Sequence, residues 1–231
     1  MNNSAKKLHQ IRAYALERPN SGPIGTKPKL GDLRFRQLLS DTQWASLPHA
    51  VRNRFSKRVE GGASAVYVGL IDAVRMNWAG RLLTQVLRLV GAPLPISRDV
   101  KVPSVVTVTE DVATHGQVWT RLYGNKQGFP QIIHSAKRFA GPTGLEEYIG
   151  AGISIALRTS VENGVLVFSS DQYFMKLGKW KIRLPGIIFP IKLKVTHEET
   201  DADAFVFTLT LSHRLLGELI YQAGHYREEQ Q

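Results

Sequence analysis

The sequence predicts an α+β protein whose N-terminal helices pack on a curved, meandering antiparallel β-sheet or half-barrel of roughly eight strands. Three observations predict this fold class. The hydrophobic period changes from about 3.6 residues to about 2 after Val102. Short turns separate the later apolar segments and leave no room for crossover helices. An Asn163-Gly164 pair, which is typical of a tight hairpin, lies between two long apolar segments.

The composition predicts one domain that comes after a basic tail. Of the 231 residues, 43% are hydrophobic and 21% are charged, which is enough for a substantial core. Residues 1–30 are rich in basic residues and end in a stretch of Pro, Gly, Ser and Asn, so we expect a flexible basic tail there. Residues 31–231 are expected to form a single α+β domain, with a helical part at 31–95 and the sheet at 102–228.

The net charge of +11 favours anionic partners such as lipid headgroups or acidic metabolites. The basic residues are spread thinly and are not interleaved with aromatic residues, so we expect no specific nucleic-acid partner. Cysteine is absent, which excludes disulfides, thiolate zinc ligands and a thiol nucleophile, and fits a reducing compartment. We expect no transmembrane segment, because charges interrupt the most apolar helical stretch, residues 66–90. A cytoplasmic location is predicted, with a membrane-peripheral one as the alternative.

Two helical pieces are predicted within residues 31–58. Asp41 or Ser40 is placed to cap the helical turns that come after it, and Pro48 opens the second helix. That second helix carries on one face the apolar residues Val51 and Phe55. Apolar residues then recur every fourth position across residues 66–90, which predicts a long helix. It is expected to lie along one face of the sheet, and a membrane-surface helix is the alternative.

Period-2 segments separated by turn residues predict the strands. They are expected at residues 104–111, 117–124, 131–140, 145–162, 165–177, 179–185, 191–199, 204–213 and 217–227. The fourth of these is a single long strand, with Gly150-Ala151-Gly152 inside it.

The hairpin at Asn163-Gly164 predicts a register that pairs Glu162 with Val165. Counted by twos, a core face carries Ile149, Ile153, Ile155 and Leu157 against Phe168 and Phe174. The opposite face carries Gly150, Gly152, Ser154, Ala156 and Arg158 against Val167, Asp171, Tyr173 and Met175. Small side chains on this second face leave room either for a closely packed helix or for a ligand. Its Arg158 and Asp171 lie on a diagonal and are expected to meet.

Catalytic and metal-binding motifs are missing from the sequence, which has no P-loop, no dinucleotide-binding glycine pattern, no GxSxG and no HExxH. The histidines lack the spacing of metal ligands, so we predict neither a metal nor a cofactor. Glu146 and Glu147 are adjacent on a strand and point to opposite faces, so they cannot act as a dyad; one of them is expected to pair with Lys137 or Arg138.

Trp119 and Arg121 share one strand face with Tyr123. An aromatic beside an arginine suits an anionic or aromatic ligand, and it is equally typical of an ordinary strand surface. The candidate ligand-binding residues are Trp119, Arg121, Lys137, Glu147, Gly152, Ser154, Ala156, Arg158, Asp171, Tyr173 and His213.

Several long segments resemble one bacterial family. They are QVWTRLYG, SAKRFAGPTGLEEYIGAGISIALRTSVENGVLVFSSDQYF, IKLKVTHEE, LLGELIYQAGHYRE, FRQLLSDTQWASLPHAVRNRFS and RLVGAPLP. Over residues 32–228 the chain resembles the domain of unknown function 4166 family. The resemblance implies a domain that stands alone in some proteins and is attached C-terminally to a saccharopine-dehydrogenase-like NAD(P)-binding domain in others. It supplies no catalytic residues, and family members tend to have His-Pro where this chain has His213-Arg214.

The sequence leaves three hypotheses for function. The first is a non-enzymatic binder of a small apolar or amphipathic anionic ligand, such as a lipid, in a sheet-lined pocket. The second is an enzyme or accessory domain that acts with a redox or lipid-modifying partner, such as an NAD(P)-binding oxidoreductase. It requires Arg158, Asp171, Lys137 and Glu147 to converge. The third is a peripheral membrane protein held by the basic residues 1–30.

Overall fold

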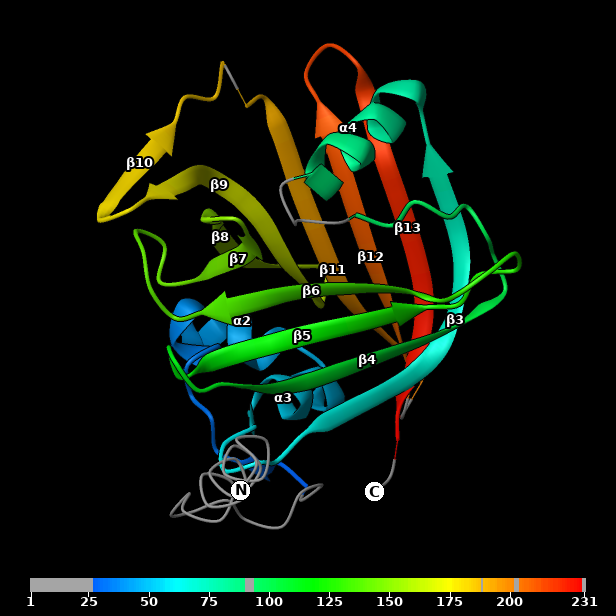
Figure 1. Ribbon diagram of the computed structural model, residues 1–231. Helices are drawn as coiled ribbons and strands as arrows, with labels where there is room; N and C mark the ends of the chain where they lie inside the picture. Colours follow the sequence, from blue (N-terminus) through cyan, green and yellow to red (C-terminus); the bar gives the residue numbers. More distant parts are fainter. Residues whose placement is uncertain (1–26, 90–93, 188, 202–203, 230–231) are drawn as a thin grey trace, which may run out of the picture.

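The computed structural model describes residues 27–89, 94–187, 189–201 and 204–229, and in this part of the chain strands dominate (Figure 1). The large sheet contains β3 (Ala65–Met76), β4 (Val102–Asp111), β5 (Gly116–Tyr123), β6 (Gln131–Arg138), β7 (Glu146–Gly150), β8 (Ile153–Glu162), β9 (Val165–Leu177), β10 (Trp180–Leu184), β11 (Ile191–Asp201), β12 (Ala204–His213) and β13 (Gly217–Glu228). A separate ribbon pairs β1 (Lys29–Leu30) with β2 (Lys57–Arg58). The helical elements are η1 (Arg36–Leu38), α2 (Asp41–Ser46), α3 (His49–Phe55) and α4 (Trp78–Leu89).

The sheet closes on itself. The order β9-β11-β12-β13-β3-β4-β5-β6-β7-β8 returns to β9, because β9 pairs with both β8 and β11. Every pairing is antiparallel. Strand β11 pairs with residues 166–169 of β9, and β10 pairs with residues 173–177, nearer the end of the same strand. The described residues therefore form a mostly β protein with a closed ten-stranded antiparallel barrel. The predicted α+β half-barrel of roughly eight strands is wrong in this respect. Closure removes the exposed strand edges that a half-barrel would leave.

The largest error in the predicted elements concerns residues 66–90. They form strand β3 and then the shorter helix α4, not one long helix. Apolar residues spaced by four lie on one face of a helix and also on one face of a strand, so the spacing alone does not distinguish the two. Residues 66–76 contain three valines, one isoleucine and one tyrosine, residue types that favour strands. The β3 strand then pairs with β4 on one side and β13 on the other.

The predicted long fourth strand is divided into β7 and β8 by a tight turn at Ala151-Gly152. Gly150, Ala151 and Gly152 all have positive φ, at 102°, 46° and 79°. This left-handed backbone reverses the chain, and β7 and β8 become antiparallel neighbours. A Cβ at position 152 would lie 2.6 Å from the carbonyl oxygen of Lys176, so glycine is also required by close backbone contact.

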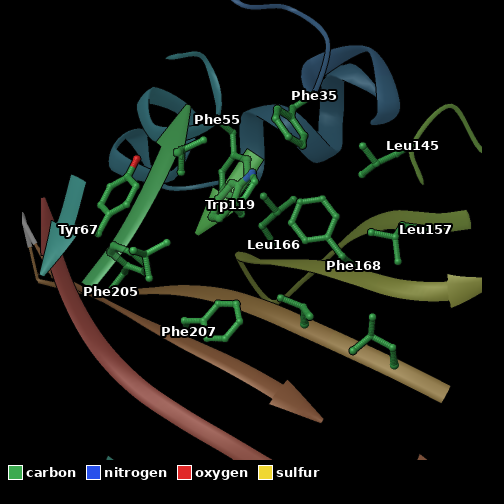
Figure 2. Close-up of a cluster of buried hydrophobic side chains, with 14 of the residues drawn as sticks. Phe35, Phe55, Tyr67, Trp119, Leu145, Leu157, Leu166, Phe168, Phe205 and Phe207 are labelled. Atoms are coloured by element: carbon green, nitrogen blue, oxygen red, sulfur yellow. The ribbon is translucent and has the colours of Figure 1, made fainter. Parts of the chain in front are cut away.

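The helices α2 and α3 cover one end of the barrel (Figure 1). Ser40 caps α2 as predicted, because its hydroxyl accepts a hydrogen bond from the backbone N–H of Gln43. Pro48 precedes the first residue of α3, whose buried residues are Val51 and Phe55. In Figure 2 the side chains of Phe35 and Phe55 point from this helical layer toward aromatic residues of the strands, among them Phe168. The ring of Phe35 lies 5.0 Å from that of Phe55 and 6.1 Å from that of Phe168, both edge-on.

Helix α4 lies at the other end of the barrel (Figure 1). Asn77 precedes it and accepts a hydrogen bond from the Gly80 backbone N–H at 2.8 Å, while its own amide nitrogen donates to the backbone carbonyls of Leu216 and Glu218. A Cβ on Gly80 would overlap the carbonyl oxygen of Leu219 on β13. The helix is thus held close to the start of β13. None of the helices described is long and apolar enough to cross a membrane.

Candidate functional site

An apolar cavity of about 100 Å³ lies inside the barrel beneath α4. Its wall comes from strands of the sheet and from the segment before β11, and its cover comes from the inner side of α4 and the residues after it. Among the lining residues are Leu83, Leu87, Leu94, Arg121, Tyr123, Ile133, Ser135, Glu147, Ile153, Ile155, Tyr173, Phe189, Ile191, Leu193, Val195, Leu209 and Leu211. The cavity is therefore a largely hydrophobic space with a few polar groups, which is the usual character of a small-molecule site.

Three charged side chains meet at the polar part of this cavity. They project inward from neighbouring strands, Arg121 from β5, Lys137 from β6 and Glu147 from β7. The Lys137 ammonium donates a hydrogen bond to the Glu147 carboxylate at 3.1 Å, and the Arg121 guanidinium lies 3.8 Å from the other oxygen of that carboxylate. All three side chains are buried. Two cations therefore share one carboxylate in the barrel interior.

The pKa shifts reflect this unequal balance of charge. Burial lowers the pKa of Lys137, and the nearby Arg121 acts in the same direction, although Glu147 opposes both. Burial alone would raise the pKa of Glu147, but Lys137 and Arg121, with hydrogen bonds from Ser135 and Lys137, lower it to about 2. Glu147 is therefore ionised at neutral pH. When Lys137 is protonated, the buried group has one positive charge more than it has negative charge, and burial, which lowers the pKa of Lys137, disfavours that state.

Two hydroxyl groups complete the polar part of the cavity. The Ser135 hydroxyl accepts a hydrogen bond from Arg121 at 3.0 Å. The Tyr173 hydroxyl, on a side chain that is only 7% exposed, has no hydrogen-bond partner among the described residues. Burial raises the pKa of Tyr173 to about 12, and the charge of Glu147 contributes in the same direction. The phenol therefore stays protonated, and its O–H donor lies at the cavity wall near the Ser170 hydroxyl.

This arrangement is suited to binding an anion beside an apolar group. Arg121 offers a planar guanidinium, Ser135 and Tyr173 offer hydroxyls, and all three residues line the cavity. Within the described ranges no group of three His, Asp or Glu side chains is placed to hold a metal ion. His197 is buried among aromatic rings, 5.0 Å from that of Phe55, and does not line this cavity. The geometry supports recognition of a ligand.

Comparison with known proteins gives one family. Residues 47–226, most of the chain, match the family model described as a domain of unknown function, DUF4166. The chain belongs to the DUF4166 family. No curated protein and no solved structure gives a significant match. The resemblance found in the sequence is thereby confirmed, and the function of this DUF4166 barrel must be argued from its own residues.

Several of the candidate residues chosen from the sequence meet in the DUF4166 barrel. Arg121, Glu147 and Tyr173 line the cavity. Lys137 lies behind Glu147, with its ammonium 5.1 Å from the centre of the Trp119 ring. The predicted pairing of Lys137 with one of the two adjacent glutamates is confirmed. Trp119 therefore supports the charged group, although it does not line this cavity itself.

The other candidates lie outside the cavity. Arg158 and Asp171 form the expected ion pair at 2.7 Å, but the Arg158 side chain is 68% exposed. Ser154 and Ala156 alternate with the cavity residues of β8 and point the other way. Two further candidates hold turns: Gly152 in the β7–β8 turn, and His213, whose Nδ1 accepts hydrogen bonds from the N–H groups of residues 215 and 216. The accessory-enzyme hypothesis requires four residues to converge, and they do not. Lys137 and Glu147 pair in the barrel interior, whereas Arg158 and Asp171 pair outside the cavity.

A β-bulge between β8 and β9 explains why each predicted face of this hairpin combined residues that lie on opposite sides of the sheet. The register of the hairpin begins as predicted, with Glu162 opposite Val165. It then shifts by one residue, because Ala156 pairs with Gln172 whereas Leu157 pairs with Ser170. A shift of one residue moves every later side chain to the opposite face. Tyr173 therefore points into the cavity, and Phe174 points outward opposite Ser154.

Ser135 and the apolar wall contributed by β11, β12 and α4 were not among the predicted site residues. Ser135 lies two residues before Lys137 on β6, so strand alternation places both on the inner face. That signal was present in the sequence. The wall residues on β11 and β12 were not recognisable as such, because only barrel closure brings them opposite β5 and β6.

Proposed function

We propose that this DUF4166 barrel binds a small carboxylic acid with an apolar chain or ring. The ligand's carboxylate would be held by Arg121, Ser135 and Tyr173, and its apolar part would occupy the cavity beneath α4. One observation carries the proposal, namely the buried Arg121 guanidinium at the wall of an apolar cavity, whose carboxylate partner Glu147 is shared with Lys137 behind it. An uncompensated buried charge is costly, and a ligand carboxylate would balance it.

The size of the cavity limits the ligand. A volume of about 100 Å³ is smaller than the roughly 150 Å³ of an engineered protein cavity that binds benzene. A ligand with more than a few carbon atoms would therefore displace Leu83 and Leu87 of α4, which cover the cavity. We infer a short or medium-length acid that enters past α4.

The test compares acids with alcohols of the same chain length by isothermal titration calorimetry. Hexanoate is expected to bind more tightly than 1-hexanol, because a hydrogen bond to a charged group contributes about 1.5–3 kcal/mol. That difference corresponds to roughly 10- to 100-fold in the dissociation constant. Across a series of acids, each added methylene should contribute up to about 0.8 kcal/mol until the chain reaches α4.

Matched variants separate the site from the rest of the surface. Arg121→Met should remove the preference for the acid over the alcohol. Arg158→Met, which alters an exposed arginine with its own carboxylate partner, should leave that preference unchanged. Leu211→Trp, which fills the cavity, should weaken binding of both ligands. Equal binding of hexanoate and 1-hexanol by the wild-type protein would refute the proposal. So would an unchanged preference in a folded Arg121→Met variant.

A further inference from the structure

Exposed apolar side chains gather at the end of the barrel that carries α4. The elements at this end are α4, the β12–β13 turn at residues 214–216 and the β10–β11 connection at residues 185–187, which we call together the mouth rim (Figure 1). Large apolar side chains of the rim that are exposed to solvent are Trp78, Leu82, Val86, Ile187, Leu215 and Leu216. Such a set of exposed apolar side chains on projecting segments marks an interaction surface.

Helix α4 carries apolar residues on two different faces. Leu83 and Leu87 line the cavity. Trp78, Leu82 and Val86 are spaced by four, lie on one side of the helix, and are 69%, 60% and 49% exposed. Packing against the barrel explains the first set and leaves the second without a partner among the described residues.

The charges of the mouth rim are positive. Arg81 and Arg88 are exposed on α4, seven residues apart and therefore on one side of the helix, and Arg214 is exposed in the β12–β13 turn. None of the three forms an ion pair with any described residue, whereas the acidic Glu218 nearby is bound by Arg75 at 2.9 Å. An apolar helix face with arginines beside it is typical of helices that lie in the headgroup region of a membrane.

We propose that the mouth rim docks on an anionic membrane surface. Trp78, Leu82 and Leu215 would enter the interface, and Arg81, Arg88 and Arg214 would contact lipid phosphates. The charge argues against a second copy of the chain as the partner, because a symmetric pair would bring two unpaired cationic rims together. This docking surface is independent of the carboxylate site, since it rests on outward-facing residues alone.

The experiment measures sedimentation of the full-length protein with vesicles of phosphatidylcholine alone, or of phosphatidylcholine mixed with phosphatidylglycerol. Binding is expected only with the anionic vesicles, and it should weaken as salt is raised. Arg81→Glu with Arg88→Glu should lower the partition coefficient by about 30-fold or more, since each basic residue near an anionic surface contributes about fivefold. Trp78→Ser with Leu82→Ser should lower it by about tenfold.

Matched controls exclude effects of total charge or total apolar surface. The charge control combines Lys29→Glu on β1 with Arg227→Glu at the end of β13 that is remote from α4. It changes the net charge by the same amount as the rim charge variant and should bind like the wild type. Leu30→Ser with Val112→Ser removes equally exposed apolar side chains outside the rim and should also bind normally. The altered side chains are all exposed, so circular dichroism should show the same fold.

The outcomes discriminate between this surface and its rivals. Equal loss of binding in the rim and control charge variants would overturn the proposal, because only net charge would then matter. A second outcome would assign membrane binding to residues 1–30 instead. In that case the rim variants would bind normally, and binding would be lost when serine replaces Lys6, Lys7, Arg12 and Arg18. A third outcome would assign the rim to self-association. In that case the wild type would not bind vesicles but would form concentration-dependent dimers, and these dimers would disappear in the variant that combines Trp78→Ser with Leu82→Ser.

Discussion

Replacing Glu147 with glutamine is expected to lower the free energy of unfolding by about 3–5 kcal/mol, the usual consequence of removing one partner from a buried ion pair. The side chains of Glu147 and Lys137 are 8% and 2% exposed, so solvent cannot stabilise the cations that remain. Arg121 and Lys137 would then face each other's charge without a carboxylate between them. The variant should remain folded near neutral pH but unfold at a lower urea concentration.

The pKa of Glu147 gives a second route to the same magnitude. A fall from the ordinary 4.5 to about 2 in the folded protein corresponds to about 3 kcal/mol. Because the folded pKa is the lower one, this contribution is fully present above pH 4.5 and is lost as the pH falls toward 2. The Glu147→Gln variant should therefore lack this component of acid sensitivity.

The unequal charge of the group predicts an unequal response to substitution. Lys137→Met leaves one cation, Arg121, beside one carboxylate, so it should destabilise by only about 1–2 kcal/mol. Glu146→Gln is the matched control, because this adjacent glutamate is also buried but lies on the other face of β7 and pairs with Lys181, whose side chain is 43% exposed. Its expected loss is about 1 kcal/mol or less, since water can solvate the freed ammonium.

The assay is urea unfolding monitored by tryptophan fluorescence, with the midpoint and slope both fitted. Two results would refute the reasoning. One is a Lys137→Met variant that is as unstable as Glu147→Gln. The other is a Glu147→Gln variant within about 1 kcal/mol of the wild type, which would mean that water or rearrangement already compensates the two cations.

Buried or close-packed positions give three further predictions. Burial holds the pKa of His197 well below 6.5, so the folded state should lose stability as the pH falls below about 6.5. Urea unfolding at pH 7.5 and at pH 5 should show a smaller loss of stability for His197→Phe than for the wild type. Gly152→Ala should destabilise by about 1–3 kcal/mol through its positive φ and its contact with the Lys176 carbonyl, whereas Gly186→Ala, which meets nothing within 4 Å, should not. Gly80→Ala should push α4 away from β13 and speed hydrogen exchange of the α4 amides, and unchanged exchange would contradict the close packing inferred there.

Local chemistry made some of the fold predictable. Asn163-Gly164 determines a tight hairpin, and this hairpin alone was enough to predict the pairing of Glu162 with Val165. Ser40 was recognisable as one of two candidate caps for α2 because a hydroxyl precedes the helix and Gln43 lies three residues later. In both places the determining residues lie within four positions of each other, so tertiary packing did not have to be known.

Where the prediction failed, the deciding contact was distant in sequence or the local signal fitted two structures. Spacing by four in residues 66–90 is satisfied by a strand as well as by a helix, and only pairing with β4 and β13 decides for β3. Closure of the barrel requires β9 to pair with β11, and β10 lies between them in sequence. The bulge after Ala156 is also invisible in the sequence, and it exchanged the faces on which Tyr173 and Phe174 lie.

Strand alternation alone gives a usable signal for the buried charged group, because it shows which charged residues point into the barrel. Arg121, Lys137 and Glu147 occupy inward positions, which in a barrel of this size are normally filled by apolar side chains. A charge at such a position is costly unless it is paired, so its presence on three adjacent strands indicates that the charges meet. Two cations with one carboxylate leave the group unbalanced, and hydrophobic side chains of similar volume would fill the same space without that penalty. While Lys137 is protonated, the excess charge supports the proposed recognition of an anion, because it does not contribute to the stability of the fold.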